Sequence, residues 1–318
     1  MSRKIVVQKL NKKYGALLKR IWRCMPLYIM MVPGICYLVI NNYLPLTGLQ
    51  LAFKKFQYAK GIWKSPWNGI KNFKFLFQTN DAWALFRNTI GYNLLFIFLG
   101  TIIAIAVAIM LSIIRSNKVK KTTQTVILIP YLLSYVVISY IVYAFLGQSN
   151  GMLNRSLLAA MGAEPIAWYT EPKYWPYVLT IVQIWKSFGY NSIIYFATLV
   201  GFDCSYYEAA VVDGASVWQQ ITRITLPMLK PTVITLTLMS VGRMFYSDFG
   251  LFFQVPMNSG MLYKVTSTID TYVYRGLLET NDIGRASAAG FIQSILGFLT
   301  VITANLIVRA IEPDNALF

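Results

Sequence analysis

The chain has 318 residues, of which 56% are apolar or aromatic and only 13% are charged. An ordinary soluble domain carries about 25% charged residues, so this composition favours an integral membrane protein with several apolar runs of bilayer length. The net charge of +17 comes from basic residues that lie mainly between apolar runs, which indicates contact with membrane lipid and excludes nucleic acid as the expected partner.

The residue types that are missing narrow the chemistry further. The sequence has no histidine, which excludes His-based acid–base catalysis and the common zinc sites. Cys24, Cys36 and Cys204 are isolated, so neither a disulfide framework nor a Cys-cluster metal site is expected. No Gly-Lys dipeptide occurs, and therefore no P-loop. We expect no catalytic residue, no metal and no cofactor bound by this chain.

The N-terminal tail, residues 1–25, holds eight basic residues and no acidic one. Its apolar residues follow helical spacing, which predicts an interfacial amphipathic helix on an anionic inner leaflet; a disordered basic tail is the alternative. The apolar stretch that follows is too long for a signal peptide and has no small-residue cleavage site after it, so a retained first span is expected.

Six apolar runs follow in chain order, and each is long enough to cross a hydrocarbon core of roughly 30 Å at about 1.5 Å per residue. The sequence predicts an all-α integral membrane protein with a six-span transmembrane domain over residues 26–318. The predicted spans are about 26–52, 89–114, 125–147, 175–200, 229–252 and 286–309.

The distribution of lysine and arginine indicates the orientation of these spans. The tail and the short connector 115–124 are rich in positive charge, which predicts that both termini lie inside the cell. The connector 53–88 disagrees, because it carries seven basic residues although alternation places it outside. Aromatic residues between 168 and 177 are typical of the outer membrane interface.

The segment 205–227, between the fourth and fifth spans, has the most specific pattern. Ser205 with Glu208, and Ser216 with Gln219, have the spacing of capping boxes that open helices. Gly214 between them can adopt a positive φ and end the first helix. The sequence therefore predicts a helix–glycine–helix element at the inner membrane face.

This segment resembles the EAA signature of importer permeases of the ATP-binding-cassette class, in which it forms a coupling helix that docks into a cleft on the ATPase. The match comprises Glu208-Ala209-Ala210, Gly214 and Ile224-x-Leu226-Pro227. Scattered matches such as Pro33-Gly34 and Pro130-Tyr131 are similar to the carbohydrate-uptake branch. The resemblance implies that the ATPase-coupling residues are Glu208, Ala209, Ala210, Asp213, Gly214, Ile224, Leu226 and Pro227. For Glu208, a purely structural capping role is the alternative.

The resemblance also implies a function and partners. We expect a permease subunit of an importer in the bacterial cytoplasmic membrane that moves a carbohydrate, in particular an oligosaccharide, by alternating access. Its expected partners are a second homologous permease, two ATPase subunits that bind ATP and Mg, and an extracytoplasmic solute-binding protein. Other cargo (a polyol phosphate, peptide or amino acid), an ion-coupled secondary transporter and a membrane-embedded enzyme are the alternatives.

Polar residues inside the predicted spans are candidates for the substrate pathway, because charged groups there cost roughly 2.5–3.5 kcal/mol each on insertion scales. Gln183, Lys186 and Tyr190 share one helical face. A hydrophilic passage for sugar hydroxyls and contacts between neighbouring helices are both compatible with such residues. The pathway candidates are Gln183, Lys186, Tyr190, Arg243, Tyr246 and Gln293.

Overall fold

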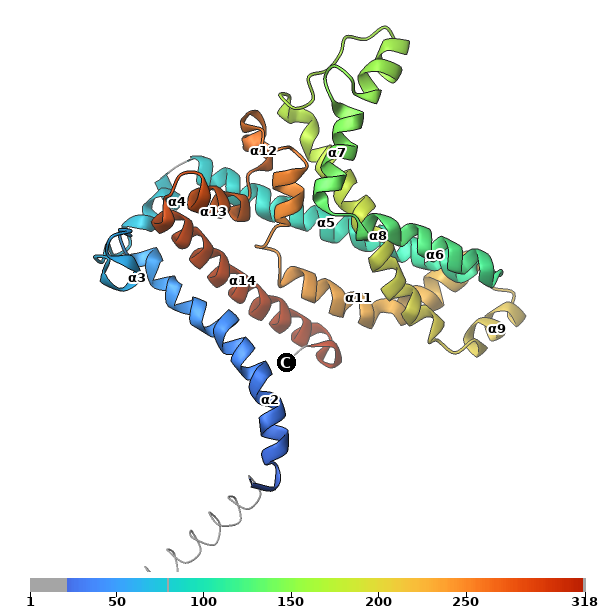
Figure 1. Ribbon diagram of the computed structural model, residues 1–318. Coiled ribbons are helices and arrows are strands. Elements are labelled where there is room, and N and C mark those ends of the chain that lie inside the picture. The colour runs from blue at the N-terminus through green and yellow to red at the C-terminus, as the bar shows by residue number, and fades with distance from the viewer. Residues whose placement is uncertain (1–21, 79, 317–318) are drawn as a thin grey trace, which may run out of the picture.

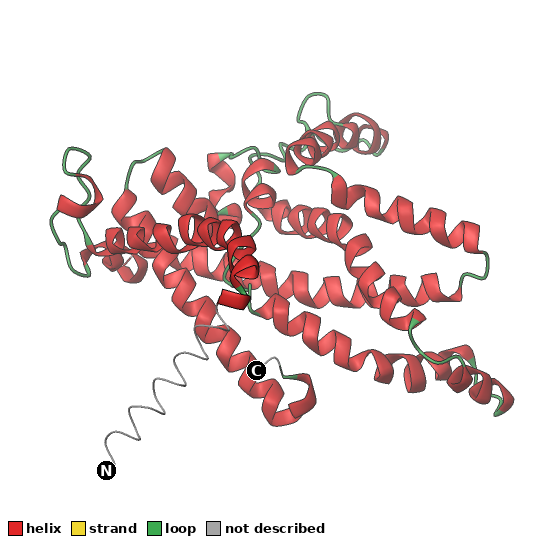
Figure 2. Ribbon diagram, turned by 60° about the horizontal axis from the view of Figure 1, so that its bottom comes forward, coloured by secondary structure: helices red, strands yellow, loops and turns green. Residues whose placement is uncertain are grey.

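The computed structural model describes residues 22–78 and 80–316. The predicted amphipathic helix of the tail lies almost wholly outside this part of the chain. Within it the secondary structure is helical, with a single isolated β-bridge between Lys54 and Trp67 and no strand. The prediction of an all-α fold is confirmed (Figures 1 and 2).

The helices follow one another in two halves. The first half contains α2 (Met25–Leu38), η1 (Val39–Tyr43), η2 (Leu44–Phe53), α3 (Gly61–Lys64), η3 (Lys71–Phe73), α4 (Lys74–Gln78), α5 (Asn80–Ile113), α6 (Asn117–Leu132), α7 (Tyr135–Leu146), η4 (Leu153–Leu158) and η5 (Pro172–Tyr174). The second half contains α8 (Trp175–Val200), α9 (Ser205–Val212), α10 (Val217–Gln220), η6 (Ile221–Thr225), α11 (Leu226–Val241), η7 (Gly250–Gln254), η8 (Gly260–Leu262), α12 (Tyr263–Thr266), α13 (Ile269–Leu278), α14 (Ile283–Ile311) and η9 (Pro313–Asn315).

Four of these helical stretches are long and apolar enough to cross a membrane, and the pair α6–α7 makes a fifth if it counts as one bent span. The four are Met25–Phe53, Ala82–Ile113, Val217–Val241 and Ile283–Ile311. Helix α8 has the predicted bounds of the fourth span, and its 26 residues extend about 39 Å at 1.5 Å per residue. Its polar residues lower its mean hydropathy, so α8 is not one of the four apolar stretches.

The predicted third span, 125–147, is not one straight helix. Helices α6 and α7 meet at an angle of 93°. Helix α6 runs through Pro130, whose missing N–H removes one bond of the ladder, and ends at Leu132. The Ser134 side chain then opens α7 by accepting a hydrogen bond from the Val137 N–H. The chain therefore turns by about a right angle within the predicted span.

The predicted fifth span, 229–252, is wrong at its C-terminal end. Helix α11 stops at Val241, and turns carry the chain from Gly242 to Asp248. The Asp248 side chain then accepts a hydrogen bond from the Gly250 N–H at 2.9 Å, which starts η7 as a separate element. The break is stabilised by these local hydrogen bonds.

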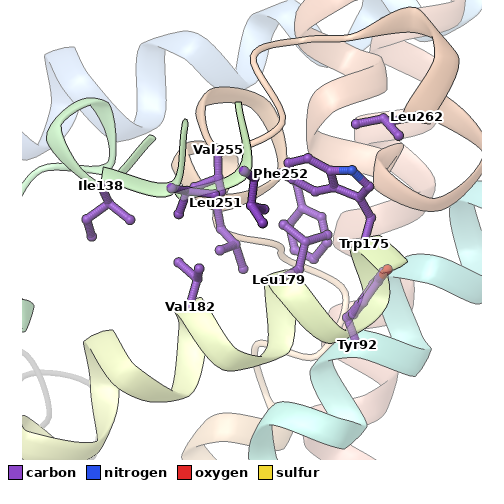
Figure 3. Packing of buried hydrophobic residues seen from close by; sticks show 11 residues of the cluster. Tyr92, Ile138, Trp175, Leu179, Val182, Leu251, Phe252, Val255 and Leu262 are labelled. Atoms are coloured by element: carbon purple, nitrogen blue, oxygen red, sulfur yellow. The ribbon is translucent and has the colours of Figure 1, made fainter. Parts of the chain in front are cut away.

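Helices α5 and α8 pack along one another, α6 covers α8, and α11 lies beside α14 (Figure 1). Helix α2 stands at the edge, with every side chain at least partly exposed. The largest buried apolar cluster joins α8 to α5, α7 and η7 (Figure 3). Its central members are Trp175, Leu179, Val182, Tyr92, Ile138, Leu251 and Phe252. The cluster thus fixes the chain around both breaks.

Gly189 allows α6 and α8 to touch, because a Cβ atom at this position would lie 1.8 Å from the carbonyl oxygen of Ile127. We expect Gly189→Val to force the two helices apart and to lower the Tm of the detergent-solubilised protein by roughly 5 °C, given overpacking costs of about 1–3 kcal/mol. The matched control is Gly290→Val in α14, where a Cβ meets nothing within 4 Å. Equal Tm values for the two variants would contradict the close packing.

Candidate functional site

A polar cavity of about 350 Å3 lies between α5, α8 and the turns that follow α11. A second cavity of about 360 Å3 adjoins it, and Thr101, Asn191, Ser240 and Arg243 line both. The first cavity also presents amides, hydroxyls, aromatic rings and a carboxylate, contributed by Asn93, Phe96, Gln183, Ser187, Tyr246, Ser247 and Asp248. Such a lining can hydrogen-bond to a hydroxylated solute and pack against its C–H faces.

Hydrogen bonds from α5 hold the cavity wall in place. The Asn93 amide donates to the carbonyl oxygens of Met244 at 2.9 Å and Tyr246 at 3.2 Å. One helical turn earlier, the Asn88 amide donates to the carbonyl oxygens of Lys264 at 3.1 Å and Ser267 at 3.0 Å. These amides satisfy backbone carbonyls in the irregular chain after α11 and in and after the short helix α12, as irregular segments within a membrane require.

The predicted pathway residues fall into two groups. Gln183, Arg243 and Tyr246 line the first cavity, and Tyr190 lines the second. Gln293 lines neither: it is buried behind the break and donates to the Phe245 carbonyl oxygen at 2.8 Å. Its position favours the alternative of contacts between neighbouring helices.

Lys186 also faces away from the cavities. Its ammonium group donates to the carbonyl oxygens of Tyr131 at 2.9 Å and Leu133 at 2.5 Å, at the end of α6. One turn further along α8, the Tyr190 ring stacks on the Tyr131 ring with 4.5 Å between centroids. The lysine therefore satisfies carbonyls that the break between α6 and α7 leaves without helical partners.

We expect Lys186→Met to lower the Tm, because two carbonyl oxygens lose their donor and a buried unsatisfied polar group costs about 1–3 kcal/mol. Thermal unfolding of the purified protein in detergent measures the effect. Lys264→Met, at an exposed lysine in α12, provides the control. A Lys186→Met protein that keeps the Tm of the wild type would show that these hydrogen bonds do not support the break.

The sequence reasoning missed several cavity residues. Ser187 and Asn191 follow the predicted Gln183 at intervals of four residues on α8, and the three form the stripe that faces the first cavity. This spacing is visible in the sequence. The predicted face of α8 that contains Lys186 and Tyr190 lies next to this stripe. Asn93 and Thr101 on α5 have no such signal, because their role depends on where α11 breaks.

The helix–glycine–helix element is present, with one of its two predicted caps. The Ser216–Gln219 capping box is confirmed: the Gln219 N–H donates to Ser216 Oγ, and the Ser216 N–H donates to Gln219 Oε1 at 2.7 Å. The predicted box between Ser205 and Glu208 is wrong. There the Asp203 carboxylate accepts from the Ser205 N–H at 2.9 Å, and this bond lowers the pKa of Asp203. The side chain of Glu208 is exposed.

Gly214 ends α9 as predicted, with φ of +75°. The Ala215 N–H donates to the Ala210 carbonyl oxygen at 2.8 Å, and the Gly214 N–H donates to the Val211 carbonyl oxygen at 3.0 Å. This pair of hydrogen bonds forms a Schellman motif, which requires a left-handed residue at the glycine position. The turn therefore sets the angle between α9 and α10.

The predicted coupling residues lie on the surface of this element or beside it. Glu208, Ala209, Asp213 and Gly214 are exposed, as are Leu226 and Pro227 at the start of α11, and Ala210 and Ile224 are half-buried. Sequence reasoning missed the apolar side chains among them, of which Val212 is 87% exposed and Trp218 is 71% exposed. Exposed apolar side chains of this size are typical of a docking surface.

A hydrogen bond connects this surface to the membrane helices. The hydroxyl groups of Tyr207 in α9 and Thr225 in η6 lie 3.1 Å apart, and Thr225 is buried. Because η6 continues directly into α11, a displacement of α9 reaches the helix that ends at the cavity. The helix–glycine–helix element and the cavity thus lie at the two ends of the stretch formed by η6 and α11.

Comparisons with known proteins agree on one class. Residues 97–314 match the family model of the binding-protein-dependent transport system inner membrane component. The chain is similar to Protein LplB of Bacillus subtilis, with 30% identity over 292 residues that cover 91% of this chain and 90% of that one. It is similar to the B. subtilis polygalacturonan/rhamnogalacturonan transport system permease protein YteP, with 29% identity over 98% of this chain and 95% of that one.

A solved structure has the same fold. It is a chain in the crystal structure of a bacterial ABC transporter involved in the import of the acidic polysaccharide alginate, with a TM-score of 0.85 and 32% identity. The match covers 93% of this chain and 99% of that chain. A second crystal structure contains the alginate transporter in complex with an alginate pentasaccharide-bound periplasmic protein, with a TM-score of 0.83 and 31% identity over 93% of this chain and 98% of that one.

Proposed function

Since the chain belongs to the family of binding-protein-dependent transport system inner membrane components, we propose that it is the permease subunit of an importer whose cargo is a carbohydrate, in particular an oligosaccharide. It is a multi-pass protein of the bacterial cytoplasmic membrane and a transport component rather than a catalytic one. The observation that carries the proposal is the polar cavity at the end of α11, with the exposed helix–glycine–helix element at the beginning of the same helix.

The cavity supports a carbohydrate cargo. Amide and hydroxyl groups of Asn93, Gln183 and Asn191 offer donors and acceptors for sugar hydroxyls, and the rings of Phe96 and Tyr246 offer flat apolar faces. Two similar proteins support the same class of cargo: one is named as a polygalacturonan/rhamnogalacturonan permease, and the other belongs to an alginate importer.

The proposed topology has six spans, with α8 as the fourth and both termini inside the cell. The polar stripe of α8 then faces the passage, while its apolar residues face neighbouring helices, so the helix can cross the membrane despite its modest hydropathy. The helix–glycine–helix element lies at the inner face. There it can reach partners in the cytoplasm.

A second, homologous permease lies against α2 in this proposal. Every described side chain of α2 is at least partly exposed, and the exposed residues that follow it include Asn41 and Asn42. Asparagine side chains are costly against lipid, and transmembrane helices use them for contacts with other helices. The Asn41 amide already donates to the Tyr37 carbonyl oxygen at 3.0 Å, and a protein partner on this face would supply further hydrogen-bond partners that lipid cannot.

The ATPase subunits are separate chains in the proposal. The two ATPase subunits form a dimer and bind ATP and Mg. One of them receives the coupling helix of this chain, the region around 206–223, and contacts its Ala209 and Ala210. Closure of the ATPase dimer moves this element, and the helix bundles rock to expose the cavity alternately to the two sides. A solute-binding protein on the outer side delivers the cargo.

The test is a pull-down of the tagged chain from detergent-solubilised native membranes, with mass spectrometry of the proteins that accompany it. Recovery of an ATPase, a second permease and, with cargo added, a solute-binding protein is the expected result. The recovered complex in proteoliposomes should import a carbohydrate only with ATP. A chain that purifies alone and transports a solute with an ion gradient would replace the proposal with a secondary transporter.

A further inference from the structure

The charges around the cavity are unequally balanced. Its carboxylate, Asp248, accepts hydrogen bonds from the N–H groups of Gly250 at 2.9 Å and Leu251 at 3.4 Å. Its cation, Arg243, forms no ion pair with any residue of 22–78 or 80–316. The carboxylate is thus compensated from its own side, and the guanidinium is not.

The position of Arg243 suits the recognition of an anion. It comes two residues after the end of α11, lines both cavities and is exposed. The carbonyl end of the helix stabilises its positive charge. A guanidinium presents parallel N–H donors that match the two oxygens of a carboxylate, so an anionic group in the cavity would bind it in bidentate fashion.

A second observation points to the same charge. Residues 54–78 contain six lysines and no acidic residue, and five of these lysines, all except the buried Lys54, are exposed. In the proposed topology this segment lies outside the cell. Positive residues normally concentrate in the loops inside the cell, so few lysines are expected here. An electropositive outer surface raises the local concentration of anionic solutes and accelerates their arrival.

We propose that the cargo is an acidic oligosaccharide that carries uronic-acid carboxylates, and that Arg243 binds one of these carboxylates in the cavity. Gln183 and Asn191, across the same cavity, bind hydroxyl groups of the sugar ring. This inference rests on the proposed function and names the substrate class of its cavity. It makes Arg243 the residue that separates acidic from neutral sugars of equal length.

The experiment measures binding of sugars to the full transporter complex in nanodiscs by equilibrium dialysis, without the solute-binding protein and its own selectivity. The probes are trigalacturonate and trimannuronate, each compared with its methyl ester. The wild type should bind at least one acid tenfold or more tightly than the ester. Arg243→Gln should weaken binding of that acid at least tenfold and leave the ester unchanged, and Arg243→Lys, which keeps the charge without the fork, should lie between.

Arg285→Gln, at an exposed arginine paired with Asp282, is the control and should bind like the wild type. Equal binding of acids and esters by the wild type overturns the proposal, and this comparison needs no variant. Equal losses for acid and ester in Arg243→Gln, or release of the second permease from that variant, also overturn it, because Arg243 would then serve the assembly. Failure of the proposed function is a different result: the wild-type transporter, supplied with its binding protein, imports no carbohydrate with ATP.

Discussion

Replacement of Gly214 by valine is expected to abolish ATP-dependent import and to release the ATPase subunits from the complex. The backbone at this position has φ of +75°, a conformation that a β-branched residue strongly disfavours. A cost of about 1–3 kcal/mol for such strain corresponds to a loss of up to roughly a hundredfold in the population of the native turn. Without the turn, Ala209 and Ala210 no longer lie at a fixed angle to α10.

Two measurements check this expectation, the amount of ATPase that co-purifies with the chain and the initial rate of uptake in proteoliposomes. Gly61→Val is the matched control, since Gly61 has a similar φ of +64° and open space around its Cβ position, but lies in the segment 54–78. Gly214→Asn should retain most of the activity, because asparagine tolerates the left-handed conformation. Full import by Gly214→Val would show that the angle of the turn is not needed for coupling.

The turn at Gly214 belongs to the features that the sequence predicts well. The turn at Gly214 and the cap at Ser216 depend on residues within three or four positions, so their spacing in the sequence is sufficient. The same holds for the helices of the apolar runs, except at the breaks within 125–147 and 229–252. The box expected at Ser205 failed although its spacing is correct, because Asp203 is a nearer acceptor for the same N–H. Local competition of this kind is visible only in the structure.

The cavity was predicted less well, for a physical reason. Its shape depends on the end of α11 at Val241, whereas the predicted fifth span continues past that residue to 252. The break is held by Asn93, whose partners Met244 and Tyr246 are about 150 residues away in the chain. Sequence periodicity reports which residues share a helical face, but it does not report which face another helix covers. The predicted face of α8 was therefore displaced by one position.

The second large effect is expected at Asn191, which lines both cavities from the centre of α8. Asn191→Leu should reduce import of the cargo by roughly ten- to a hundredfold, because a sugar hydroxyl that loses its partner in a dry site costs about 1–3 kcal/mol. The ATPase activity of the complex and its assembly should remain, since the proposed docking surface on α9 is at the other end of α11. Uptake and ATP hydrolysis are measured in the same proteoliposomes.

Thr198→Val is the control for this variant on the same helix. The Thr198 hydroxyl donates within its own helix, to the Ile194 carbonyl oxygen at 3.3 Å, and Thr198 lines neither of the two cavities. Its loss of polarity should leave both rates near those of the wild type. If Asn191→Leu lost import and ATP hydrolysis together, the residue would act in coupling or folding rather than on the cargo. Loss of import alone would place the cargo beside α8, on the stripe formed by Gln183, Ser187 and Asn191.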